Sequence, residues 1–211
     1  MGAAEVVATV QQVRAGRVRS IAAMAKEAFA RHRVTPLWHG LPCGGGMIEA
    51  RAWHCGDPDS GYHSFTLVAI PGRLIVVGDL GTCVWERERD MLAWARGSVE
   101  SLDYFASKVV SEIKTEEYDP DVVRAWAHEL DRDILAGEHD YDSRRAKLWL
   151  GEQVRQSVLD AIDEGEHEVC RVIHESGLED GCDFPDFTNW KPGFLWAREA
   201  VKWFLANHGG G

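Results

Sequence analysis

The segment between residues 167 and 182 combines two histidines with two cysteines, the side chains that most often hold zinc. His167, Cys170 and His174 are three and four residues apart, so a helix would place them on one face, and Cys182 follows in the next loop. Two imidazoles and two thiolates suit tetrahedral zinc. Zinc ligands more often come in closely spaced pairs, however, and apolar residues such as Val169 predict that this helix packs against a core. We therefore expect no required cofactor, with zinc as the one metal this cluster could hold.

Carboxylates are the most numerous reactive side chains, and two segments hold most of them. Residues 112–142 contain 11 acids and three bases, and residues 160–186 contain 10 acids and one base. Acids at strand ends beside a cleft can hold two metal ions. These acids lie in predicted helices and loops, which favours a charged, partner-binding surface. The candidates for that surface are Glu112, Glu116, Glu117, Asp119, Asp121, Asp131, Asp133, Asp140, Asp142, Asp163, Glu164 and Glu166.

Asp79 is a lone acid between apolar segments, in the sequence GDLG. A tight turn explains an aspartate there, because its side chain bonds nearby backbone, so Asp79 is only a weak catalytic candidate. The sequence has no nucleophile elbow, Walker loop or HExxH motif, and the glycine-rich residues 40–46 precede a predicted strand rather than a helix. We expect a protein that binds rather than catalyses. The alternative is a metal-dependent or small-ligand enzyme with a pocket near Asp79.

The elements that must position these residues divide the chain into two halves. Helix periodicity covers the first 34 residues, and residues 40–46 read as a loop. Alternating or apolar segments predict strands over 47–54, 62–70, 73–78 and 82–86. Their short connections allow only antiparallel pairing, so we expect a meander of three to four strands.

The second half of the chain reads as helical. Helices are predicted over residues 91–96, 102–113, 120–135, 143–164, 166–175 and 193–207, with an ordered loop over 178–192. Asp90, Ser101 and Asp119 are the expected N-caps. The fold class is therefore α+β, a small antiparallel sheet packed by helices. With no obvious linker, residues 1–211 are expected to form one domain, whose core takes most of the nine tryptophans.

Charge separates the same two halves. The net charge of −11 divides into +1 for residues 1–100 and −12 for residues 101–211. Such a balance does not suit direct binding to a nucleic-acid backbone. No apolar segment is long enough for a membrane helix, so we expect no membrane association. Five cysteines without a CxxC pair predict reduced thiols and a cytoplasmic location. An acidic surface that simply keeps the protein in solution remains the alternative to a partner surface.

Residues 71–109 and a tryptophan-rich helix near residue 200 carry a pattern of spaced glycine, aromatic and charged residues. Its members are Pro71, Gly72, Leu74, Ile75, Gly78, Asp79, Gly81, Trp85, Arg87, Asp90, Met91, Trp94, Arg96, Tyr104, Phe105, Ala106, Lys108, Trp196, Ala200, Val201 and Trp203. This pattern resembles a group of accessory proteins of tailed bacteriophages and prophages. The resemblance covers about a third of the chain, and the match of the helix near residue 200 is loose. It implies a phage accessory protein in the cytoplasm of a bacterial host and carries over no particular activity.

Together these observations predict a phage-encoded inhibitor of a host defence system, either anti-CRISPR-like or directed at another defence. The expected partner is a host protein or ribonucleoprotein complex with a basic groove, which the acidic residues would enter in place of nucleic acid. Besides the enzyme, a virion or assembly protein is the other alternative.

Overall fold

A computed structural model describes residues 2–43, 46–111, 114–135, 141–176 and 187–208. Its contacts group into two compact units, which we describe separately. Unit 1 comprises Met1–Arg17 and Glu116–Asn189, and unit 2 comprises Val18–Thr115 and Trp190–Gly211. The fold is α+β, as predicted. The expectation that residues 1–211 form one domain stays a prediction.

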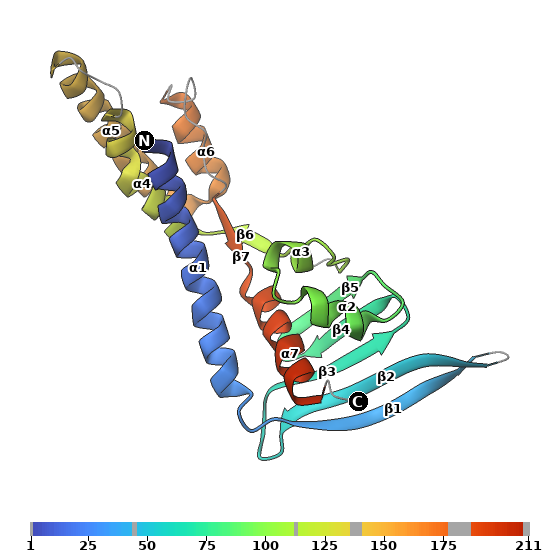
Figure 1. Ribbon diagram of the computed structural model, residues 1–211. Coiled ribbons are helices and arrows are strands. Elements are labelled where there is room, and N and C mark those ends of the chain that lie inside the picture. Colours follow the sequence, from blue (N-terminus) through green and yellow to red (C-terminus); the bar gives the residue numbers. More distant parts are fainter. Residues whose placement is uncertain (1, 44–45, 112–113, 136–140, 177–186, 209–211) are drawn as a thin grey trace. The chain divides into compact units, whose positions relative to one another are not determined.

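Unit 2 contains a five-stranded antiparallel meander (Figure 1). The strands are β1 (Arg33–Cys43), β2 (Gly46–Asp57), β3 (Ser60–Ile70), β4 (Arg73–Gly78) and β5 (Gly81–Glu86), paired in chain order. The meander is confirmed, and β1 adds a strand where the sequence predicted a loop from residue 40. β1 is an edge strand with register shifts between Pro36 and Trp38 and between His39 and Leu41. An edge strand with such irregularities tolerates proline, which cannot complete a central ladder.

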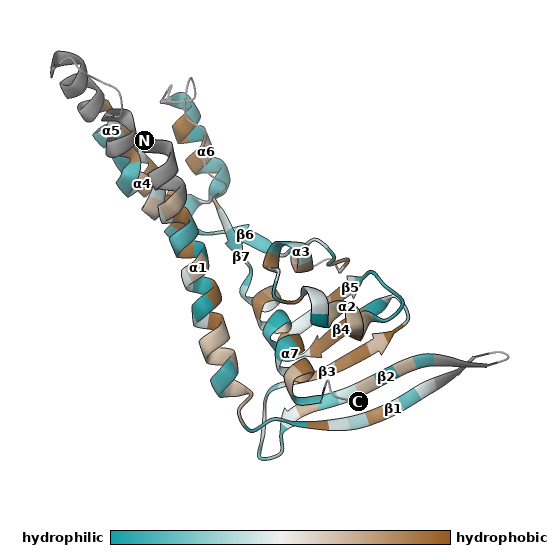
Figure 2. Cartoon of the chain, in the orientation of Figure 1, coloured by the Kyte–Doolittle hydropathy of each residue, from teal (hydrophilic) through white to brown (hydrophobic). Residues whose placement is uncertain are grey.

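One face of this sheet packs against helices. Alternate residues of β3 and β4, including Phe65, Leu67, Leu74 and Val76, are almost fully buried. Figure 2 shows apolar residues gathered in these two strands. The covering helices are α2 (Met91–Ser98), α3 (Leu102–Ala106), α7 (Pro192–His208) and the part of α1 (Gly2–Ala28) that belongs to unit 2. The alternation of strand residues therefore places the core of unit 2 between the sheet and these helices.

Local sequence explains how α2 begins and why α3 is short. The Asp90 carboxylate accepts N–H groups of Leu92 and Ala93 at 3.1 and 3.0 Å, which confirms the predicted cap. Helix α3 ends at Ala106 rather than at the predicted residue 113, because the next residues join the sheet edge. Val109 forms a bridge with Trp85 of β5, and the Val110 N–H donates to Val84. The strand preference of consecutive valines thus outweighs helical periodicity here.

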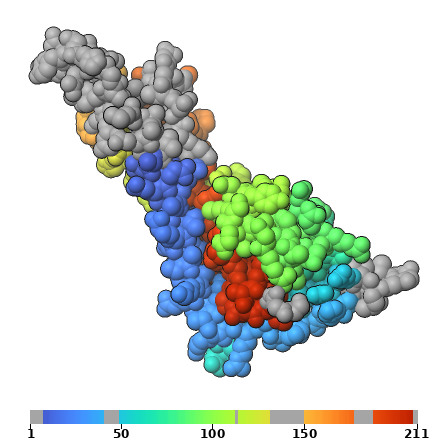
Figure 3. Space-filling model, in the orientation of Figure 1, coloured from blue at the N-terminus to red at the C-terminus, as the bar shows by residue number. Residues whose placement is uncertain are grey.

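Helix α7 is central to the packing of unit 2. Figure 3 shows it between the later part of α1 and the α2–α3 segment of this unit. It buries Phe194, Leu195 and Phe204, and its buried Arg198 donates from Nε to the Val99 carbonyl at 2.8 Å. Across the part of the chain that the structure describes, no helix is long and apolar enough to span a membrane.

Unit 1 is helical apart from one small sheet. Helices α4 (Pro120–Leu135), α5 (Tyr141–Ala161) and α6 (Glu166–Glu175), a 3-10 turn η1 (Ile162–Glu164) and the first part of α1 surround a separate core. Trp126, Val158 and Val169 are buried in it, and Trp126 meets Phe187 edge-on at 5.5 Å. Strands β6 (Glu116–Tyr118) and β7 (Thr188–Trp190) pair where the sequence predicted only a loop before residue 192. Residues 177–186 of that loop lie outside the described residues.

Candidate functional site

Acids from both acid-rich segments meet on the surface of unit 1. Arg124 of α4 bonds Asp121 in the first turn of the same helix at 2.8 Å, and its other nitrogen lies 3.8 Å from Asp163 in η1. Tyr118 lies beside the same group, and its hydroxyl donates to the Ile162 carbonyl at 3.2 Å. Burial raises the pKa of Tyr118, and the charges of Glu166 and Asp163 raise it further. Residues more than 40 positions apart in sequence therefore form one cluster.

We call Asp121, Asp163, Glu164 and Glu166 the acidic cluster. The side chain of Asp121 is 70% exposed and that of Asp163 is 92% exposed. Glu164 and Glu166 are also exposed, at the end of η1 and the start of α6. Arg124 is the base that the structure places between Asp121 and Asp163, so it neutralises only part of this surface. The acidic cluster is thus open to a partner and negative.

Asp119 has a different place from the other acidic candidates. It is 2% exposed, and one of its carboxylate oxygens lies 2.9 Å from Arg17 and accepts from Asn189 at 2.7 Å. The other oxygen accepts from the Asp121 N–H at 3.0 Å, which confirms the predicted helix cap. A carboxylate buried and bound in this way holds unit 1 together, so we remove Asp119 from the partner-binding set.

The other acids predicted for the partner surface are half-buried or have side chains outside the described part of the chain. Glu116 and Glu117 are half-buried in β6, and Glu117 lies 3.5 Å from Arg17. Glu112 and Asp140 lie outside the described residues. Asp131, Asp133 and Asp142 belong to α4 and α5, and their side chains lie outside the described part. They stay predictions.

The predicted zinc ligands share α6 but do not form a complete site. His167, Cys170 and His174 are all exposed on this helix, and Cys182 lies outside the described residues. Partial burial, and then the charge of Glu166, raise the pKa of the Cys170 thiol. Among the described residues, no three His, Cys, Asp or Glu side chains are grouped to hold a metal ion. Zinc binding therefore depends on Cys182 and stays a prediction.

Asp79 ties two strands of unit 2 together. It lies in the turn between β4 and β5, where its carboxylate accepts the Ser64 N–H at 3.1 Å and its own N–H donates to the Ser64 carbonyl at 3.1 Å. Two cavities of unit 2 are lined by other residues and do not include Asp79. The pocket expected near Asp79 stays a prediction.

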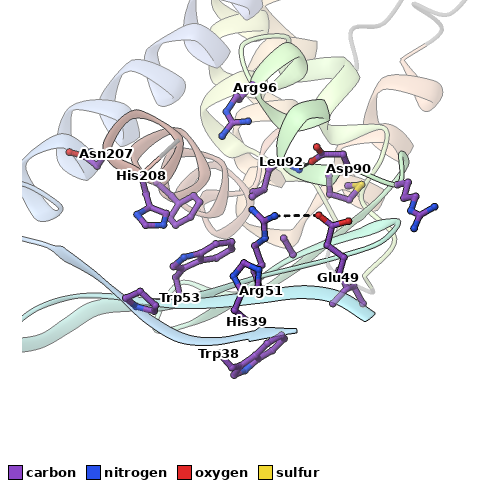
Figure 4. A pocket seen from close by; sticks show the side chains of 16 residues that line it. Trp38, His39, Glu49, Arg51, Trp53, Asp90, Leu92, Arg96, Asn207 and His208 are labelled. Carbon is purple, nitrogen blue, oxygen red and sulfur yellow. Dashed lines mark hydrogen bonds and ion pairs between the residues drawn. The ribbon is translucent and has the colours of Figure 1, made fainter. Parts of the chain in front are cut away.

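The larger cavity, of about 860 Å³, lies between the β1–β2 edge of the sheet, the start of α2 and the end of α7 (Figure 4). Its lining includes Arg51, Arg96, His39, His208 and Trp53. We call it the basic cavity. The sequence does not reveal this cavity, because its lining residues come from β1, β2, β3, α2, α7 and the loop before α2, between positions 36 and 208. The alternation of Glu49, Arg51 and Trp53 on one face of β2 was the available sign, but it does not identify the elements opposite.

The described residues thus contain an exposed acidic cluster on unit 1 and a basic cavity within unit 2. Comparison of the chain with protein-family models, with curated proteins and with solved structures finds no match.

Proposed function

We propose that this protein acts by binding a macromolecular partner through the acidic surface of unit 1. The observation that carries the proposal is the division of charge between the two units. Unit 1 holds 22 acids against nine bases, a net of −13, whereas unit 2 holds 12 acids against 14 bases, a net of +2. Nearly all of the excess negative charge therefore belongs to one compact unit rather than to the surface as a whole.

The arrangement of the acidic cluster supports a basic partner. Its carboxylates are exposed and come from α4, η1 and α6, so they are fixed on folded elements rather than on a tail. Exposed carboxylates can occupy the positions that phosphates take in a basic groove, and long-range attraction speeds such an encounter. A protein or ribonucleoprotein that binds nucleic acid presents such a groove.

The resemblance of residues 71–109 to phage accessory proteins favours a partner in host defence. On this proposal the protein is phage-encoded, works in the cytoplasm of the bacterial host, and inhibits a defence complex by occupying its nucleic-acid groove. It needs no catalytic residue, because occupancy alone excludes the nucleic acid.

The proposal is tested by charge reversal in unit 1 with a matched control in unit 2. The test variant combines Asp121→Lys, Asp163→Lys and Glu166→Lys. The control combines Asp59→Lys, Glu88→Lys and Asp103→Lys, which are also exposed acids and change the net charge by the same amount. Each tagged protein is incubated with extract of a bacterial host, and the retained proteins are identified by mass spectrometry.

We expect the wild type and the control to retain a nucleic-acid-binding complex that the test variant loses. Added duplex nucleic acid should displace this complex, and its retention should fall steeply as salt rises. Circular dichroism verifies that the test variant is folded. Equal retention by the test variant and the control, or a complex that nucleic acid does not displace, would refute the acidic-mimic proposal.

A further inference from the structure

The sheet of unit 2 has a second apolar face, opposite the face on which the described helices of this unit pack. Successive residues of a strand point to opposite faces, so the residues that alternate with the buried Phe65, Leu67 and Val76 belong to this second face. We call it the outer face and define it by Thr66, Val68, Ile70, Ile75, Val77, Thr82 and Val84. An antiparallel sheet with one face in water normally carries polar residues there. Five of these seven residues are valine or isoleucine, which is typical of a sheet covered on both faces.

One row of the outer face crosses the sheet without a charged residue. Val68 of β3 pairs with Ala52 of β2 and with Ile75 of β4, and Ile75 in turn pairs with Val84 of β5. The row continues beyond β5, because the Val110 N–H donates to the Val84 carbonyl at 2.8 Å. Side chains directly opposite one another on neighbouring strands lie about 4.5–5.5 Å apart, so these residues form a continuous apolar stripe. From β1 to the segment after α3, the stripe consists of Trp38, Ala52, Val68, Ile75, Val84 and Val110.

Solvent reaches the outer face and the end of its stripe. Val77 is 40% exposed and Val110 is 52% exposed, while Val68, Ile75 and Val84 are half-buried. Among the described residues, these five side chains do not pack into the core of unit 2. An apolar surface that extends across a whole sheet in this way marks a site of protein association.

The charges of the outer face favour an apolar partner without net charge. Arg73 and Glu86 follow the same alternation at one end of this face, where they pair with each other at 3.1 Å. Unit 2 carries a net charge of only +2, against −13 for unit 1. A nucleic acid or a basic groove therefore gains little from this face, whereas the outer face of a second copy is also apolar and nearly neutral.

We propose that two copies of this chain associate through their outer faces, sheet against sheet. Each copy contributes the same surface, so the contact is isologous, as in most homodimers. The valine and isoleucine side chains of the two faces interdigitate across sheets about 10 Å apart, as they do within a β-sandwich. The dimer is independent of the acidic cluster, because the outer face belongs to unit 2.

The area of the outer face suits a specific but reversible dimer. Strands spaced about 4.8 Å apart make the face about 25–30 Å wide from β1 to Val110, and the six residues of β4 or β5 make it about 20 Å long. Two such faces bury about 1,000–1,200 Å² in total, which is the lower limit for specific protein interfaces. We therefore expect a dissociation constant in the micromolar range rather than a permanent dimer.

Salt separates this association from the binding of a partner to unit 1. Each chain has a net charge of −11, so two copies repel each other at low ionic strength. Salt screens this repulsion and leaves apolar contacts in place, so the dimer should strengthen as salt rises. Binding of the acidic cluster to a basic groove should weaken over the same range.

The test is sedimentation equilibrium of the whole chain from about 1 µM to about 500 µM, at low and at high salt. The apparent mass should rise from that of one chain toward that of two. The test variant, Val77→Lys, places an ammonium group on the outer face and should raise the dissociation constant at least about tenfold. Met24→Lys is the matched control, because Met24 is 46% exposed on α1 in unit 2 and the change in charge is the same. It should leave the dissociation constant within about twofold of the wild type.

Four outcomes would overturn the proposal. The chain stays monomeric at every concentration, or the dimer dissociates as salt rises, which would assign the contact to charged residues. Alternatively, Val77→Lys and Met24→Lys weaken the dimer equally, which would place the contact elsewhere. Finally, a monomeric chain retains a host protein that Val77→Lys loses, which would assign the outer face to another protein. Thermal unfolding verifies that both variants are folded, and Val110→Lys replaces Val77→Lys if the latter does not fold.

Discussion

The guanidinium of Arg17 lies 2.9 Å from the buried carboxylate of Asp119 in unit 1. More than 100 residues separate them in sequence, so this contact joins the end of the first segment of unit 1 to the start of α4. Asn189, at the other end of the unit's second segment, donates to the same carboxylate oxygen at 2.7 Å. Asp119 therefore connects three distant parts of the chain, although the sequence assigned it to a partner surface.

Replacing Asp119 by alanine should destabilise unit 1 strongly. The change leaves the Arg17 charge without this partner, deprives the buried Asn189 amide of an acceptor and removes the cap of α4. Breaking one side of a buried, charged hydrogen-bond network costs about 3–5 kcal/mol. Urea unfolding followed by circular dichroism measures the loss.

The neighbouring acid provides the control for Asp119. Asp121 is 70% exposed and pairs with Arg124 on the surface, so Asp121→Ala should cost less than about 1 kcal/mol. If both variants lost the same free energy of unfolding, the network around Asp119 would have no special structural role.

Substitution of Gly78 by alanine should also destabilise unit 2, for steric reasons. Gly78 has φ of +156°, and a Cβ atom there would lie 2.3 Å from the Ser64 carbonyl oxygen and 2.7 Å from the Phe65 Cα. Both are backbone atoms of the paired strand, so the strands must move apart. We expect a loss of more than about 2 kcal/mol in urea unfolding.

Gly61 is the matched control, because nothing lies within 4 Å of an added Cβ there and its φ is ordinary. Gly61→Ala should change the free energy of unfolding by less than about 0.5 kcal/mol. A Gly78→Ala protein as stable as Gly61→Ala would mean that β3 and β4 are not paired in this register.

The buried thiols of unit 2 should be unreactive in the folded protein. Burial raises the pKa of Cys55 and of Cys83 from 9.0 to about 12, so almost no thiolate exists at pH 8. In a Cys43→Ser, Cys182→Ser background, a disulfide reagent should titrate only the exposed Cys170 before unfolding and all three cysteines in urea. The absorbance of the released thiolate gives both counts. Rapid titration of more than one thiol in the native protein would contradict the burial of Cys55 and Cys83.

Asp79→Ala should weaken the β4–β5 turn without affecting partner binding. The change removes the acceptor of the Ser64 N–H in an exposed turn, which costs about 0.5–1.5 kcal/mol. Thermal unfolding and the retention assay of the proposed function measure the two effects. A folded Asp79→Ala protein that loses its partner would contradict the assignment of partner binding to unit 1.

The sequence predicted the elements whose patterns are local. Alternation and short turns identified β3, β4 and β5, and periodicity gave the bounds of α6, Glu166–Glu175, as the structure has them. Prediction from the sequence failed where contacts between distant residues decide the secondary structure. Val109 leaves a helical pattern because Trp85 offers a pairing position, and Thr188 belongs to a strand because β6 lies beside it. Neither partner is visible in the local sequence.

The candidate sites too were only partly predictable from the sequence. Composition alone identified the acidic segments, but not that Arg124 lies between Asp121 and Asp163, nor that Asp119 is buried. The basic cavity could not be predicted, because the position of His208 opposite Trp53 depends on how α7 crosses the sheet. A sequence gives the type of each residue, whereas the packing of helices and strands decides which side chains meet.

Unit 2 is built from two separate segments of the chain, and this constrains how it folds during synthesis. All five strands have been synthesised once Glu86 is added, yet α7, which covers part of their apolar face, begins only at Pro192. The whole second segment of unit 1 is translated in between. At about 5–20 residues per second, this interval lasts roughly 5–20 s. During this interval the apolar face that contains Phe65 and Leu67 lacks the part of its cover that α7 supplies, so the core of unit 2 is completed only after α7 has been made.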